Sequence, residues 1–178
     1  MKYISKPLIH LLLLGFTFAS STASACEDSA YRDFDFWLGK WQVTQANGHP
    51  AGTNHITKTL NDCVIHEHYV SVNGYEGNSL NIYDQTTGKW HQTWMDNTGL
   101  LLQLDGGIVT RGEGENAIKE MAMWGEGLDQ SGRTVMHRII WTPHPDGTVQ
   151  QRWQVSHDQG INWQMLFDGM YTKEKVEK

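Results

Sequence analysis

The sequence predicts an all-β protein, a single antiparallel up-and-down β-barrel of about ten strands. Turn signals rich in Gly, Asn and Asp recur at short intervals between residues 47 and 160, and such residues supply the positive φ angles of tight hairpins. The runs between them are rich in Val, Ile, Thr, Trp and Tyr, which strands prefer. A β-sandwich would show the same alternation. Closure into a barrel removes exposed strand edges, which favours the barrel.

The N-terminal residues have the pattern of a secretory signal peptide. Two lysines lie within residues 1–6, an apolar run covers residues 8–18, and Ala23-Ser24-Ala25 is a small-residue cleavage site. The apolar run is too short to span a bilayer as a helix, and no later stretch resembles a transmembrane segment. We therefore expect residues 1–25 to be removed and residues 26–178 to form a single β-barrel domain.

The two cysteines of the chain, Cys26 and Cys63, both remain after this cleavage. In an oxidising compartment their simplest use is one disulfide that ties the mature N-terminus to a strand. The expected location is therefore the periplasm or the outside of the cell. An alternative is a lipoprotein anchored through an acylated Cys26, because Ala23-Ser24-Ala25-Cys26 partly fits that signal.

The acidic balance of the chain narrows the classes of partner. The formal net charge is −6, and removal of Lys2 and Lys6 makes it −8. A protein this acidic, without a basic run, is a poor candidate for binding nucleic acid or an anionic membrane surface. Composition gives no indication of the oligomeric state.

An aromatic-rich stretch from Phe34 to Val43 leads into the first predicted strand, residues 36–46. Apolar residues occupy both alternating faces of this stretch, as in an element that closes a core. Gly39 allows a bend or a close backbone approach. Residues 28–33 favour at most a short helical turn before it. The other predicted strands cover residues 53–60, 62–72, 78–84, 89–97, 100–105, 107–112, 116–124, 133–142, 148–156 and 161–172, with a turn at Asp105-Gly106-Gly107.

Several of these strands have one aromatic-rich face that also carries a polar residue. Trp90, Gln92 and Trp94 share a face, and so do residues 135, 137, 139 and 141, residues 149, 151, 153 and 155, and residues 161, 163, 165, 167 and 171. A barrel can turn these faces inward and form a cavity for a small apolar or aromatic molecule. The predicted lining is Gln92, Trp94, His137, Trp141, Gln151 and Trp153, with Glu67 and Tyr69 at the rim. The alternative is a solid core filled by the eight tryptophans, in a purely structural envelope protein.

Two histidines and a turn motif are candidate sites of chemistry. His66 and His68 share one strand face, the spacing of some metal sites, but no third ligand accompanies them and no metal or cofactor is predicted. Residues 156–163 resemble an Asp-box, in which Asp158 accepts backbone N–H groups and Trp163 packs over the turn. An enzyme using Glu67 and His137 as acid and base on a hydrophobic metabolite or a carbohydrate is an alternative function.

The ordered set of aromatic motifs resembles a known family. Phe34-Asp-Phe-Trp37-Leu-Gly39-Lys-Trp41 contains the Gly-x-Trp of a calycin first strand, and it is followed by the segments 62–67, 79–84, 89–96, 141–143 and 147–153. Over nearly the whole mature chain, the sequence resembles the exported, lipocalin-like DUF1579-type bacterial proteins of uncharacterised function. The resemblance implies a calycin-like β-barrel. It implies no reaction, no catalytic residue and no cofactor.

Overall fold

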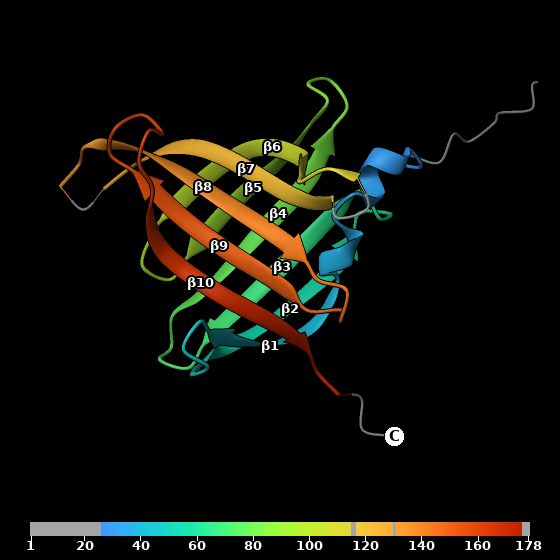
Figure 1. Cartoon of the computed structure of the whole chain (residues 1–178), viewed down its shortest axis with the longest axis horizontal. Coiled ribbons are helices and arrows are strands. Elements are labelled where there is room, and N and C mark those ends of the chain that lie inside the picture. The colour runs from blue at the N-terminus through green and yellow to red at the C-terminus, as the bar shows by residue number, and fades with distance from the viewer. Residues whose placement is uncertain (1–25, 115–116, 130, 176–178) are drawn as a thin grey trace, which may run out of the picture.

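The computed structural model describes residues 26–114, 117–129 and 131–175 of the 178-residue chain. It is a closed barrel of ten antiparallel strands, in which each strand pairs with its chain neighbours and β10 closes onto β1 (Figure 1). The strands are β1 (Gly39–Gln45), β2 (Pro50–Thr59), β3 (Val64–Ser71), β4 (Glu76–Asp84), β5 (Lys89–Asp96), β6 (Leu101–Arg111), β7 (Ile118–Leu128), β8 (Thr134–Pro143), β9 (Val149–Ser156) and β10 (Gln164–Lys173). The predicted up-and-down barrel is confirmed. The predicted signal peptide, residues 1–25, lies outside the described residues.

The segment before β1 is helical, where a strand had been predicted from residue 36. It contains two short 3-10 helices, η1 (Ser29–Arg32) and η2 (Asp35–Trp37), and lies across one end of the barrel (Figure 1). The strand begins only at Gly39, whose φ of +139° is a backbone conformation that favours glycine. The alternation of Phe34, Phe36 and Leu38 is therefore not that of a strand. The helical turn lets Phe34 and Trp37 point together into the barrel.

These two side chains begin a solid aromatic core at the covered end. Phe34 stacks on Trp37 with ring centroids 4.9 Å apart, and it meets Trp90 and Trp141 edge-on at 5.7 and 5.1 Å. The indole N–H of Trp41 donates to the carbonyl of Trp37 (2.8 Å). All five side chains are buried. We call this group the closed-end cluster: Phe34, Trp37, Trp41, Trp90 and Trp141. Offset and edge-on aromatic contacts add to the stability gained by burial.

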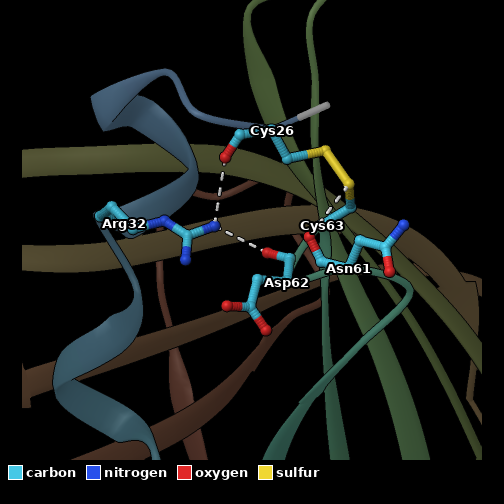
Figure 2. The surroundings of a disulfide bond; sticks show 5 residues. All are labelled: Cys26, Arg32, Asn61, Asp62 and Cys63. Carbon is cyan, nitrogen blue, oxygen red and sulfur yellow. Dashed lines mark hydrogen bonds between the residues drawn. A yellow bond between two sulfur atoms is a disulfide. The ribbon is translucent and has the colours of Figure 1, made fainter. Parts of the chain in front are cut away.

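A disulfide fastens the covering segment to the β2–β3 turn (Figure 2). Cys26 and Cys63 are bonded, as predicted from the sequence. The guanidinium of Arg32 donates to the carbonyls of Cys26 (3.4 Å) and Asp62 (2.7 Å), which joins the same two segments a second time. The turn residues 60–62 all have positive φ, which non-glycine residues adopt at a cost. The disulfide and Arg32 hold the turn in this conformation.

Strand β6 is continuous, so the turn predicted at Asp105-Gly106-Gly107 is wrong. Residues 105–107 pair with β7 throughout. A Cβ on Gly106 would lie 2.0 Å from the carbonyl oxygen of Ala122 on β7. Gly106 therefore serves the close approach of two strands rather than a reversal of the chain. The two strands predicted at 100–105 and 107–112 are one.

The last strand starts later than predicted and its faces shift. Residues 161–163 belong to the β9–β10 turn, and a register shift between Met165 and Phe167 interrupts the alternation of β10. Ile161 and Met165 are consequently exposed, while Phe167 and Tyr171 face inward. The turn is Asp-box-like as predicted, because Asp158 accepts from the backbone and side-chain N–H groups of Asn162 (2.8 and 2.7 Å).

In the part of the chain that the structure describes, no helix has both the length and the apolar character needed to cross a membrane.

Candidate functional site

The half of the barrel away from the closed-end cluster is hollow. It contains a cavity of about 210 Å³. Tyr75 in the β3–β4 turn and the half-exposed Leu166 at the start of β10 contribute to it, which places its mouth at the end opposite η1 and η2. The lining residues are Glu67, Tyr69, Tyr75, Gln92, Trp94, Leu102, Ile139, Gln151, Trp153, Leu166, Phe167 and Tyr171. The interior thus combines a solid end with a hollow one.

The wall near the mouth is aromatic and is held by one carboxylate. The rings of Tyr75 and Trp94 stack with centroids 6.3 Å apart. Asp96 accepts from the hydroxyl of Tyr75 (2.8 Å) and from the indole N–H of Trp94 (3.2 Å). Burial disfavours the charge of Asp96, but hydrogen bonds from Thr98, Tyr75 and Trp94 outweigh it and lower the pKa of the carboxyl to about 2. Asp96 is therefore ionised at neutral pH and orients both rings.

Glycines on the inner surface make room for two of the aromatic wall residues. A Cβ on Gly77 would lie 2.2 Å from the ring of Trp94, and a Cβ on Gly169 would lie 2.5 Å from the ring of Phe167. Each ring therefore packs against the backbone at a point where the strand carries no side chain. The shape of the cavity depends on these two glycines.

The floor of the cavity is a hydrogen-bonded network centred on Glu67. The amide of Asn54 donates to one carboxylate oxygen of Glu67 (2.7 Å), and the hydroxyl of Ser79 donates to the other (2.6 Å). Strands β2, β3 and β4 are neighbours in the sheet, and Asn54, Glu67 and Ser79 are buried on its inner side. A carboxylate inside a barrel must be paired in this way, because an unpaired buried charge is costly.

The network extends in both directions around the barrel. On one side the amide of Asn81 donates to Ser79 (2.9 Å), and Gln92 donates to Asn81 (2.8 Å). On the other side Asn54 also donates to the hydroxyl of Tyr171 (3.4 Å), and Tyr171 donates to the amide oxygen of Gln151. The floor therefore joins β9, β10, β2, β3, β4 and β5 by side chains.

Burial changes the acidity of the group at the centre of this floor. Loss of solvent raises the pKa of Glu67 from 4.5 to about 7, although the hydrogen bonds from Ser79 and Asn54 oppose the shift. Near neutral pH the carboxyl is therefore divided between its charged and neutral forms. The same burial raises the pKa of Tyr171 well above its usual value, and the neighbouring Glu67 adds to the shift.

Six of the eight residues predicted to line a cavity do so: Glu67, Tyr69, Gln92, Trp94, Gln151 and Trp153. Glu67 lies in the buried floor, however, and not at the rim as predicted. Trp141 instead belongs to the closed-end cluster, in contact with Phe34 and Trp37. His137 is not part of the lining either. Its ring lies over Gly127, and it accepts from the indole N–H of Trp153 (3.1 Å). His137 therefore bonds a lining residue without being part of the lining itself.

The geometry does not join Glu67 and His137 as an acid–base pair. Glu67 is bonded to Asn54 and Ser79, and His137 to Trp153. His66 and His68 face the outside of the barrel, where they bond Asn78 (3.0 Å) and Glu76 (2.7 Å). Within the described ranges, no cluster of three or more His, Cys, Asp and Glu side chains is arranged to hold a metal ion.

Sequence reasoning missed half of the floor. Asn54, Ser79 and Asn81 read as ordinary polar strand residues, and Tyr171 was assigned only to an aromatic face. Register is the signal for two of them, Ser79 and Asn81: Glu67 is directly opposite Ser79 in the β3–β4 pairing, and Asn81 is opposite Gln92 in the β4–β5 pairing. A prediction of strand pairing, rather than of strands alone, would have brought them together.

Comparison with models of known protein families finds no match to this chain, and a search of curated proteins finds none either.

Proposed function

We propose that this protein binds a small apolar or aromatic molecule inside the barrel. The observation that carries the proposal is the cavity of about 210 Å³, with an aromatic wall and a polar floor. An apolar protein cavity of about 150 Å³ is large enough to hold benzene. A pocket with mainly apolar walls and a few convergent polar groups is the usual form of a small-molecule site.

Export from the cytoplasm is part of the proposal. The Cys26–Cys63 disulfide supports it, because disulfides persist in oxidising compartments such as the periplasm or the extracellular medium. A cysteine bonded to Cys63 has no free thiol to acylate, so the disulfide favours the protein without a lipid anchor. Membership of the DUF1579-type, calycin-like group is likewise a proposal, supported by the barrel and by the Gly-x-Trp at the start of β1.

The indole N–H signals of the tryptophans provide a site-resolved test. We expect titration with benzyl alcohol, a neutral aromatic probe, to shift the ¹H–¹⁵N resonances of Trp94 and Trp153, which line the cavity. The resonances of Trp37 and Trp141 in the closed-end cluster are expected to stay in place. Both sets of signals come from one sample, so each is the control for the other.

Two results would oppose the proposal. If neither cavity tryptophan responds at millimolar probe, the cavity does not admit an aromatic molecule. If all eight indole signals shift together, the probe acts on the whole protein rather than at this site.

A further inference from the structure

The charge at the cavity floor restricts the class of ligand. Glu67 is the only acidic residue among the lining residues, and no lysine, arginine or histidine is among them. The other titratable groups that face Glu67 are the hydroxyls of Tyr69, Tyr75 and Tyr171, which are neutral at physiological pH because burial raises the pKa of each. The only charge that the floor can carry is therefore negative.

The hydrogen-bonding groups of the floor favour the same class of ligand as its charge does. An ionised carboxylate can accept about four hydrogen bonds, and Glu67 receives two, from Asn54 and Ser79. The single hydroxyl protons of Ser79 and Tyr171 are already donated to Glu67 and Gln151. Asn54 Oδ1 is buried and has no partner among the described residues. Among the described residues, the amide N–H groups of Gln151 are the donors of the floor without a partner. The charged acceptor, Glu67, and the buried Asn54 Oδ1 lie beside it, so the floor suits a group that donates at Glu67.

The aromatic wall of the cavity also favours a positively charged or apolar ligand. Tyr69, Tyr75, Trp94, Trp153 and Phe167 present aromatic rings to the cavity. Aromatic faces attract cations as well as apolar groups. An anionic head would instead lie against a carboxylate in a site of low dielectric, without a cation to compensate it.

We infer that the cavity takes an organic amine, with its protonated nitrogen on the Glu67 carboxylate and its apolar or aromatic body against Trp94, Trp153 and Phe167. This inference rests on the proposed function and deepens it, because it names the chemical class of the ligand. The same charge disfavours fatty acids and other apolar carboxylates.

Three probes with one body and different heads test this inference: 2-phenylethylamine, 2-phenylethanol and phenylacetate. Their affinities are measured by calorimetry at pH 8, where Glu67 is mostly ionised and an alkylammonium with a pKa of about 10 is still charged. We expect the amine to bind at least about tenfold more tightly than the alcohol, because only the amine forms a charge-assisted hydrogen bond with the Glu67 carboxylate. Phenylacetate is expected to bind most weakly.

The substitution Glu67→Gln removes the charge and keeps the size of the side chain, so the preference for the amine over the alcohol is expected to disappear. Glu76→Gln makes the same chemical change on the outside of β4, where Glu76 bonds His68, and is expected to keep the preference. In the wild type, amine binding near pH 7 is also expected to release protons, because it selects the ionised form of Glu67. Calorimetry in two buffers of different ionisation enthalpy measures this release.

The outcomes separate this inference from the proposed function. Equal affinity for amine and alcohol, or tightest binding of phenylacetate, would overturn the inference and leave a cavity that binds neutral or anionic molecules. An amine preference that persists in Glu67→Gln would overturn it as well, because the ammonium group would then not lie on the Glu67 carboxylate. If none of the three probes binds, the inference is overturned as well. The response of Trp94 and Trp153 to benzyl alcohol then decides the proposed function independently.

Discussion

Glu67 combines burial with hydrogen bonding in a way that makes it a reporter of the barrel interior. It is 3% exposed, and its carboxyl keeps a proton to about pH 7 in the folded protein. In the unfolded chain the same group ionises near pH 4.5. Between these values the folded state binds more protons than the unfolded state, so the free energy of unfolding falls as the pH rises.

The pH dependence of stability tests the environment of this residue. From pH 4.5 to 8 we expect Glu67 to cost the wild type about 3 kcal/mol of unfolding free energy. Glu67→Gln cannot ionise, so its stability relative to the wild type should rise by about that amount over the same range. Urea unfolding of both proteins at several pH values gives the difference between their unfolding free energies. The contributions of His137 and the other titrating groups are the same in both proteins and cancel in this difference.

Parallel stability profiles for the two proteins would show that Glu67 is exposed or paired in some other way. The difference is needed because His137, whose pKa is lowered by burial and by the nearby His157, makes stability rise with pH in an overlapping range.

Gly169 provides a test of the cavity wall at a single carbon atom. In Gly169→Ala the added Cβ would lie 2.5 Å from the ring of Phe167, so the ring must move. We expect the affinity for benzyl alcohol to fall about tenfold or more, which corresponds to about 1.4 kcal/mol, because the displaced ring changes the wall that the probe contacts. Gly107→Ala is the matched control, because its Cβ would meet nothing within 4 Å.

Equal affinities in these two variants would mean that the ring of Phe167 does not form part of the binding wall. A folded Gly169→Ala protein, checked by circular dichroism, is the condition for the comparison.

How far the sequence predicts this site differs from one residue to the next. Alternation places Glu67 and Tyr69 on the face opposite His66 and His68, because side chains in a strand alternate strictly, but it predicts them at the rim and not in the floor. Trp141 and His137 share a strand face as predicted, yet neither reaches the cavity. Alternation determines the face but not the depth along the barrel, and Trp141 lies at the end that the N-terminal segment fills. Ile139, between the two on the same face, lines the cavity, so depth does not account for His137, whose ring packs over Gly127 and bonds Trp153 instead.

At the scale of elements, the covering segment of residues 26–38 closes one end of the barrel and thereby leaves the cavity at the other. Its anchors are the disulfide, the ion pair of Lys58 with Asp35 (2.7 Å) and the hydrogen bond from the indole N–H of Trp90 to the carbonyl of Ala30 (3.2 Å). The aromatic density of Phe34 to Trp41 predicted a core element but not its helical form. Short 3-10 turns have no long periodic pattern to detect, and an alternating apolar stretch resembles a strand.

Removal of the disulfide is expected to lower the stability of the protein without changing ligand binding in the cavity. The two cysteines are 37 residues apart, and chain-entropy arguments assign about 3–4 kcal/mol to a loop of this length. We expect the double variant Cys26→Ser, Cys63→Ser to lose stability of this size in urea unfolding. Its affinity for benzyl alcohol should stay close to that of the wild type, because the cavity opens at the other end.

A double-serine variant that remains folded but no longer binds the probe would contradict this separation between the two ends. Unchanged stability would instead indicate that Arg32 and the aromatic contacts alone hold the segment in place.

At the scale of the whole molecule, the aromatic residues divide between two roles. Trp37, Trp41, Trp90 and Trp141 form a solid end, while Trp94 and Trp153 line a hollow one. The choice between a filled core and a cavity could not be made from the sequence, because both put large rings on the inner faces of strands. The structure contains both, and the lining of the hollow end includes the buried carboxylate of Glu67.

The most direct test of the central claim is native mass spectrometry of the protein purified from the organism that encodes it. We predict a mature chain beginning at Cys26, two mass units lighter than its reduced form because of the disulfide, with an additional small molecule that is released on denaturation. The released molecule should be apolar or aromatic. A protein that shows only the mass of its polypeptide in native and denaturing spectra, and that also fails to bind benzyl alcohol, would contradict the account.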